Sequence, residues 1–462
     1  TAREAMARTV DAVEALKSFL GYEGPRNYLV LLQNQDEIRA TGGFIGATIE
    51  LPFQDGVLGE VKFEDSTRID RPPLIDNPTA PEPIFWYLWI ARLLFRDSNW
   101  NPDFPTAARS MIDFYENGTG AQVDGVIATT KLLALDLLDV VGTVRIPGVA
   151  GEVTREIADR YVEGELSFQC EARHVSTRGK RCFDEDLVAA LLIELRSGLD
   201  DQGRGRLIDT LRDHLERKNV LLYTLDPKTE DLFLANGWGG RVPAPSQDFL
   251  MVIDSSLPGH TTDDVTRTWD YFVSIEPDAM SHARLRLRFE NTRAAEASIC
   301  RQAALGGGGC YWNYVRAFIS PAAEEITLPS VPLHQGTEKL IWGHRELETA
   351  SVLVHGGPAL EGLVEVGGYV VVEPGSVLTM PVTYELDPRV VRRVDDGRYE
   401  YRLQLVKQPG IDGDQINVRL ELPAGASVTA SSPSGVRSDG RDVTWEGTLE
   451  SDMELVVVFE TG

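Results

Sequence analysis

Apolar residues at helical spacing open the chain. They recur every three or four positions, at Met6, Val10, Val13, Leu16 and Leu20. This spacing predicts an amphipathic helix that ends at Gly21. We therefore expect an N-terminal helix within residues 1–24, which would fit the end of a longer stalk.

Continuous apolar runs and helical patterns alternate from residue 25 onward. Residues 27–33 read NYLVLLQ, a run typical of a strand that is buried on both faces of a mixed sheet. A hairpin is predicted over residues 44–63, because its Asp55-Gly56 pair suits a tight turn. Helices are predicted over 83–95, 106–115, 131–141, 185–196, 206–218 and 227–235, and strands over 123–128, 219–224 and 249–254. This alternation predicts an α/β domain, a mixed sheet with helices on its faces.

Alternation with a period of two residues replaces this pattern from Val265 onward. We expect these strands to extend the α/β sheet in antiparallel fashion, so that the α/β domain covers residues 25–357. Beyond Pro358, short strands separated by turn residues continue without helical spacing. This predicts a C-terminal all-β sandwich of the immunoglobulin or fibronectin kind over residues 358–462.

The charge of the chain excludes one class of partner. Its 462 residues include 45 Lys plus Arg against 71 Asp plus Glu, a net charge of −26. A nucleic-acid groove would need a local reversal of sign, and no basic run with interleaved aromatic residues supplies one. No segment reaches the ~20 apolar residues of a membrane-spanning helix, and the nearest approach, residues 84–95, contains Arg92. We expect no nucleic acid and no membrane span within this chain, although an anchor upstream of Thr1 would fit.

The four cysteines form two close pairs. Cys170 and Cys182 are twelve positions apart, and Cys300 and Cys310 are ten apart. Loops of this size are readily closed by local disulfides, which is the arrangement we expect. Free thiols are the alternative, and zinc is disfavoured because neither pair has C-x2-4-C spacing. Disulfides would place the protein outside the cytosol, where the glycosylation sequon at Asn117 could also be used.

A polar loop follows the first predicted strand. Residues 33–46 read QNQDEIRATGGFIG, and ligands bind at strand ends in α/β sheets. Arg39 beside flexible backbone could hold a phosphate or a carboxylate. Alternatively, the two glycines only shape a turn, and Arg39 pairs with Asp36 or Glu37.

A second polar loop, residues 95–105, reads FRDSNWNPDFP. Asp97, Asn99 and Asp103 offer oxygen ligands for a hard cation, although the loop lacks the spacing of an EF-hand. Alternatively, Asp103 or Thr106 caps the next helix and the loop has only a structural role.

These segments resemble a known family. YLVLLQNQDEIRATGGFIGA, RDSNWNPDFPTAAR, VDGVIAT and the later YRLQLVKQPG are similar to the bacterial family called domain of unknown function 4012. The resemblance extends over roughly residues 25–460. It implies an envelope protein, commonly anchored by an upstream helix, whose α/β domain is distantly similar to the LytR-CpsA-Psr envelope glycopolymer transferases.

Those transferases imply a site for phosphoryl transfer. They move a polymer from a polyprenyl pyrophosphate carrier to the cell wall, using arginines to hold the pyrophosphate and an acidic residue with a divalent cation. The candidates in this chain are the ligand-binding Arg39, Arg68, Arg96, Arg173 and Arg178 and the catalytic Asp65 and Asp97. Two features depart from the family: the basic stretch 173–181 lies between two cysteines, and residues 254–264 lack the expected Asn and Lys.

Two functional hypotheses follow. We expect an extracellular or cell-surface envelope protein with a structural or adhesive role, whose partners are other envelope proteins or copies of itself, and which uses no cofactor. The alternative is an active phosphotransferase that uses Mg²⁺ and a polyprenyl-linked glycopolymer. No hydrolase elbow, zinc-protease motif, P-loop or dinucleotide fingerprint is present. The hypotheses differ in whether the candidate arginines converge on one pocket.

Overall fold

The chain forms two compact units. The computed structural model describes residues 13–70, 77–88, 90–162, 165–170, 181–257, 264–294, 309–328, 353–355, 360 and 362–461. The α/β unit comprises residues 1–35, 40–81 and 90–241, and the sandwich unit comprises residues 36–39, 82–89 and 242–462. The predicted N-terminal helix is confirmed for residues 13–19, and residues 1–12 lie outside the described part.

A mixed sheet forms the centre of the α/β unit. Among the described residues it has six strands in the order β3-β2-β1-β5-β6, with β4 beside β2. The strands are β1 (Arg26–Asn34), β2 (Phe44–Gln54), β3 (Val57–Leu58), β4 (Lys62–Asp65), β5 (Gly125–Thr130) and β6 (Val220–Thr224). β1 runs parallel to β5 and antiparallel to β2. The apolar run predicted as a central strand is therefore β1, and its residues Tyr28 to Leu31 are buried.

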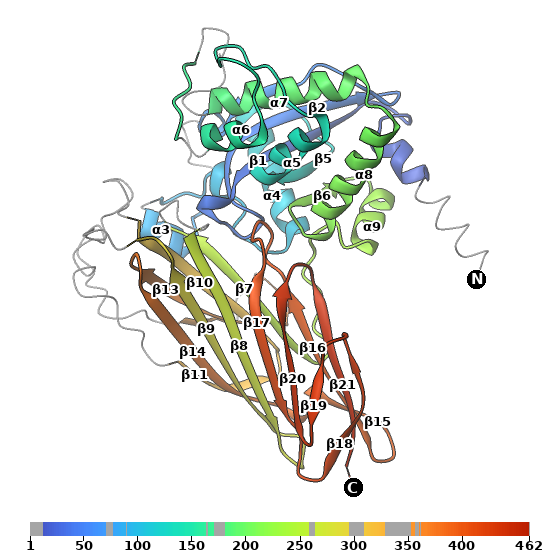
Figure 1. Cartoon of the computed structure of the whole chain (residues 1–462), viewed down its shortest axis with the longest axis vertical. Helices are drawn as coiled ribbons and strands as arrows, with labels where there is room; N and C mark the ends of the chain where they lie inside the picture. Colours follow the sequence, from blue (N-terminus) through green and yellow to red (C-terminus); the bar gives the residue numbers. More distant parts are fainter. Residues whose placement is uncertain are drawn as a thin grey trace. The chain divides into compact units, whose positions relative to one another are not determined.

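Helices pack on this sheet and on one another (Figure 1). They are α2 (Ser66–Ile69), α4 (Phe104–Thr119), α5 (Lys131–Val141), α6 (Arg155–Val162), α7 (Arg181–Ser197), α8 (Asp201–Glu216) and α9 (Pro227–Ala235), with the short 3-10 helices η1 (Gln35–Glu37) and η2 (Phe95–Asp97). α4 buries Ala108 and Met111 in one core with Leu29 and Leu31 of β1. α5, α6 and α7 share a second core around Phe183. The predicted mixed α/β architecture is confirmed.

The sandwich unit consists of two sheets and a short helix, α3 (Glu82–Leu88). Its strands are β7 (Asp248–Ser256), β8 (Val265–Ile275), β9 (Ser281–Asn291), β10 (Tyr311–Ile319), β11 (Ala323–Thr327), β12 (Leu353–His355), β13 (Val364–Val372), β14 (Val377–Leu386), β15 (Val391–Asp395), β16 (Arg398–Val406), β17 (Asp414–Glu421), β18 (Ala426–Ser432), β19 (Arg437–Asp439), β20 (Asp442–Leu449) and β21 (Met453–Thr461), with the 3-10 helix η5 (Pro388–Val390) before β15. Within the described residues, one sheet has the order β12-β13-β10-β7-β16-β21-β18, with β15 beside β16. The other has the order β11-β14-β9-β8-β17-β20-β19.

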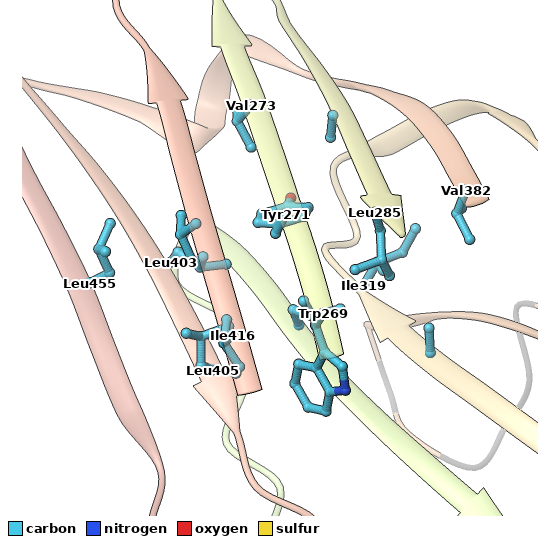
Figure 2. Packing of buried hydrophobic residues seen from close by; sticks show 14 of the residues in the cluster. Trp269, Tyr271, Val273, Leu285, Ile319, Val382, Leu403, Leu405, Ile416 and Leu455 are labelled. Atoms are coloured by element: carbon cyan, nitrogen blue, oxygen red, sulfur yellow. The ribbon is translucent and has the colours of Figure 1, made fainter. Parts of the chain in front are cut away.

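The two sheets share one hydrophobic core. Trp269, Tyr271 and Leu285 from one sheet meet Ile319 and Leu403 from the other (Figure 2). In β9, buried and outward positions alternate, as in the sequence ARLRLRF. This alternation is what a sheet with one face in the core requires.

The predicted boundary near Pro358 is wrong, because the units divide near Val242. β7 pairs in parallel with β16, and β8 pairs in parallel with β17. Both sheets therefore contain strands from before and after Pro358. Neither the strands before Pro358 nor the strands after it form a complete sheet by themselves. The strands after residue 248 belong to the sandwich and do not extend the α/β sheet.

Two short segments from the first part of the sequence also join the sandwich unit. Tyr87 of α3 stacks on Tyr369 of β13, with ring centroids 3.8 Å apart and nearly parallel planes. In the segment 36–39, the Ile38 carbonyl accepts a hydrogen bond from the Ser256 amide at the end of β7. The predicted helix over residues 83–95 is thus shorter than expected and ends at Leu88.

Candidate functional site

Polar side chains gather at one edge of the sheet in the α/β unit. The parallel strands β1 and β5 end side by side there, with Gln33 opposite Thr130. β4 ends at the same edge, because Asp65 lies opposite Ala47 near the start of β2. We call this group the polar edge; its members are Gln33, Thr41, Asp65, Ser66, Asn99, Thr130 and Arg181.

An amide network fixes the polar edge. The Asn99 Nδ2 group donates to Gln33 Oε1 at 2.9 Å and to the Gly43 carbonyl at 2.7 Å. Gln33 also exchanges two hydrogen bonds of 3.0 Å with Thr41. Gly43 has a φ of 152°, and a Cβ there would lie 2.2 Å from the Asn34 carbonyl oxygen, so only glycine fits. The two polar loops predicted as candidate sites therefore contact each other. The Asn99 amide group joins them through structural hydrogen bonds.

Asp65 and Arg181 form the charged part of the polar edge. Arg181 Nη1 lies 2.5 Å from Asp65 Oδ1. Asp65 also accepts from the amide and the hydroxyl of Thr67, at 2.9 and 2.6 Å. Burial raises the pKa of Asp65, but the hydrogen bonds from Thr67 and Arg181 outweigh it and hold the pKa below its usual value. The carboxylate is therefore ionised at neutral pH.

Arg181 was not among the predicted ligand-binding residues. It is the last residue of the basic stretch 173–181 and directly precedes Cys182. Cys182 is bonded to Cys170, with 5.6 Å between their Cα atoms. The predicted disulfide is thus confirmed, and its position beside Arg181 was the signal that could have identified this residue.

Three buried oxygen atoms of the polar edge lack a hydrogen-bond partner among the described residues: Asn99 Oδ1, Ser66 Oγ and Thr130 Oγ1. Thr130 occupies the N-cap position of α5, yet its side chain makes no capping hydrogen bond. The positive end of the α5 dipole therefore lies beside an uncommitted hydroxyl.

Of the predicted ligand-binding arginines, the three in the described part of the chain each have partners within the protein. Arg39 belongs to the sandwich unit, where its Nη1 donates to the carbonyls of Ile38 and Ser256. Arg68 pairs with Glu64 at 2.7 Å. Arg96 lies 3.7 Å from Asp70 and 4.0 Å from Asp97. Arg173 and Arg178 lie outside the described residues.

The predicted metal ligands of residues 95–105 have other contacts in the structure. Asp103 caps α4, accepting from the amide and the hydroxyl of Thr106 at 3.2 and 2.6 Å. Asp97 is buried beside Arg96, and Asn99 serves the amide network. In the part of the chain that the structure describes, no group of three or more His, Cys, Asp or Glu side chains could hold a metal ion. The three predicted ligands of this loop therefore each have a partner within the protein.

The remaining candidates are dispersed. Cys310 is disulfide-bonded, and its expected partner Cys300 lies outside the described residues. Asn117 of the sequon is exposed in the last turn of α4. A hollow of about 470 Å³ at the opposite end of β5 is lined by residues that include Arg109 and Asp124, and by no residue predicted from the sequence.

The comparisons with known proteins bear on one part of the chain. Residues 23–165 match the family model described as "Protein of unknown function (DUF4012)". The predicted resemblance is confirmed over these residues. They make up less than half of the chain. No curated protein matches it.

Solved structures give low similarity. TagV from Bacillus subtilis is 13% identical, with 47% of this chain and 80% of that chain covered and a TM-score of 0.27. A protein from Streptococcus agalactiae is 10% identical, with 47% and 74% covered and a TM-score of 0.30. A protein from Listeria innocua is 12% identical, with 46% and 79% covered and a TM-score of 0.27. At these TM-scores the similarity supports no functional assignment. Among the described helices, none is long and apolar enough to cross a membrane.

Proposed function

We propose that this chain is an extracellular or cell-surface envelope protein with a structural or adhesive role, whose partners are other envelope proteins or copies of itself. The main support for this proposal is that the candidate arginines in the described residues already have protein partners. Arg39, Arg68 and Arg96 each already bind a protein carbonyl or carboxylate. A pyrophosphate would have to displace these partners, in a protein whose net charge of −26 repels anions.

The cysteines support the location. Cys170 and Cys182 are joined, and Cys310 is also disulfide-bonded. Disulfides persist in oxidising compartments and are rare in the cytosol. The sandwich unit supports the role, because a β-sandwich of two packed sheets is a common architecture of adhesive and spacing modules.

A glycopolymer phosphotransferase is the second candidate, and one observation favours it. At the polar edge, Arg181 pairs with Asp65, the residue before Ser66, and the buried hydroxyls of Ser66 and Thr130 lack partners among the described residues. A guanidinium, free hydroxyls and the N-terminus of α5 are groups that can bind a phosphate. Asp65 would be the acidic residue of such a site.

Calorimetric titration with farnesyl pyrophosphate, a soluble polyprenyl pyrophosphate, distinguishes the structural proposal from the phosphotransferase. The titration is carried out with and without Mg²⁺. We expect no saturable heat with either the wild type or an Arg181→Gln variant. Arg212→Gln is the matched control, because Arg212 is exposed and pairs with Asp209, three residues earlier on α8. Micromolar binding that is lost in Arg181→Gln and kept in Arg212→Gln would replace the structural proposal with the second candidate.

The location is tested separately on intact cells of the native host. A membrane-impermeant biotin ester should label the protein without lysis, and a maleimide should label no cysteine unless a reductant is added. Labelling of the protein only after lysis would refute the proposed location.

A further inference from the structure

A continuous row of side chains without a carboxylate crosses the outer face of the sheet that contains β8 and β9. Each member lies directly opposite the next on the neighbouring strand. We call it the arginine row; from β14 to β19 it consists of Thr383, Arg284, Phe272, Arg419, Thr444 and Arg437. Residues directly opposite in a sheet share one face. Leu285 and Val418, the chain neighbours of two members, point into the core, so the row faces outward.

The arginine row has a regular spacing. Adjacent strands are about 4.8 Å apart, and the three arginines occupy every second strand, so positive charges recur about every 10 Å. Phe272 and Thr444 fill the positions between them. The Arg419 guanidinium lies over the Phe272 ring, 5.7 Å from its centroid.

The arginines of the row are exposed, and two of them are uncommitted. Arg284 and Arg437 have no ion-pair or hydrogen-bond partner anywhere in the described ranges. Arg419 pairs with Asp442 at 2.9 Å, and both side chains remain partly exposed. In a chain with 71 acidic residues, two unpaired arginines on one row are a distinct feature.

The neighbouring rows carry acids, some of which pair with arginines. On one side, Asp270 pairs with Arg286 at 3.4 Å, and the exposed Glu446 lies farther along that row. On the other side, Glu421 pairs with Arg441, Glu385 lies 3.8 Å from His282, and Asp442 pairs with Arg419 of the row itself. Asp439, at the end of that side, is exposed and has no ion pair among the described residues. These carboxylates repel an anion that leaves the row. A ligand must therefore be narrow and extended, with its charges in line.

We propose that the arginine row binds an extended acidic polysaccharide that lies across the strands and carries one carboxylate or phosphate for every two sugar rings. An extended polysaccharide advances by roughly one strand spacing per ring, so alternate rings would meet Arg284, Arg419 and Arg437. The half-buried Phe272 ring offers an apolar surface to the sugar face between two charges. The row threonines supply hydroxyl donors and acceptors. The inference rests on the adhesive role proposed above and names its partner.

The test uses the full chain and hyaluronan decasaccharide, which carries one carboxylate per disaccharide. Binding is measured by calorimetry at 20 mM and 150 mM NaCl, beside chitohexaose as a neutral glycan and polyphosphate as an anion without sugar. We expect binding of hyaluronan that weakens with salt, no binding of chitohexaose and weaker binding of polyphosphate. Arg284→Gln and Arg437→Gln should each weaken it by about two- to fivefold, and together by about tenfold, as exposed charge pairs do.

Arg288→Gln is the matched control, because Arg288 lies on the same strand and face as Arg284 but pairs with Glu290 at 2.7 Å. It should bind hyaluronan like the wild type. A glycan of the same spacing with phosphates in place of carboxylates distinguishes the two anion sources. Equal binding by the wild type and the double variant, or polyphosphate binding as tight as hyaluronan binding, would overturn the inference. A protein labelled only after lysis that still binds hyaluronan through the row would refute the proposed location and leave the arginine row intact.

Discussion

Asp248 should make the stability of the sandwich unit depend on pH. Its carboxylate is buried between the sheets and accepts hydrogen bonds from the hydroxyls of Tyr271 and Tyr401, at 2.7 and 2.5 Å. Tyr384 donates in turn to the Tyr271 hydroxyl at 2.9 Å. Burial raises the pKa of Asp248 to about 6, although the two tyrosine hydrogen bonds act to lower it.

The sign and size of the effect follow from this shift. Protonated Asp248 is favoured in the folded state, so its stabilising contribution is complete below pH 3.8, the ordinary value, and is lost as the pH rises through about 6. A shift of about two units corresponds to about 3 kcal/mol in the free energy of unfolding. About 2 kcal/mol of this falls between pH 4.5 and 7.5. The variant Asp248→Asn cannot ionise and should not lose this contribution.

Hydrogen exchange of peptides from β7, β8 and β16 measures the opening of the sandwich unit in the full chain. Between pH 4.5 and 7.5, the stability of Asp248→Asn relative to the wild type should rise by about 2 kcal/mol, or about thirtyfold in protection. Burial also raises the pKa of Asp414 to about 6, but that residue is present in both proteins and cancels in the comparison. Asp439→Asn, at an exposed position in β19, is the control and should show no such trend. A constant difference between wild type and Asp248→Asn across this range would refute the reasoning.

Three further outcomes are expected. Cys182→Ser should lower the stability of the α/β unit by about 2–4 kcal/mol, measured by urea unfolding against the oxidised wild type; an unchanged midpoint would contradict this. Arg267→Met should cost about 3–5 kcal/mol by the same assay, because it leaves two buried aspartates without their cation; a Lys replacement that restored full stability would show that only charge matters. A fragment of residues 358–462 should fail to melt cooperatively, since it contains only part of each sheet; a cooperative β-type melt would contradict the structure.

Local patterns predicted most of the elements. The apolar run of β1, the helical spacing of α4 and α5 and the alternation of β9 each reflect burial of a face within one element. Such burial depends on residues close in sequence, so a single sequence can reveal it. The N-cap of α4 is a similar case, because Asp103 precedes the helix that it caps.

The division into units could not be predicted in the same way. Strands before and after Pro358 share the same alternation, so the pattern does not reveal which strands pair. The parallel pairs β7 with β16 and β8 with β17 join segments more than a hundred residues apart. Those pairings depend on the registry of whole sheets, and short-range periodicity contains no information on it.

The candidate site shows why residue type alone cannot rank the arginines. In an acidic chain most arginines find a carboxylate nearby, as Arg68 of α2 does with Glu64, four residues earlier in β4. The useful distinction is between cations that the fold neutralises and cations that it leaves exposed, and only the three-dimensional pairing reveals it. By this criterion Arg284 and Arg437 are better candidates for binding an external anion than Arg39, although no motif surrounds them. Two arginines on this exposed strand face stay unpaired in a chain with a net charge of −26, although acidic residues lie on the neighbouring rows. This arrangement is expected where an external anion provides the partner.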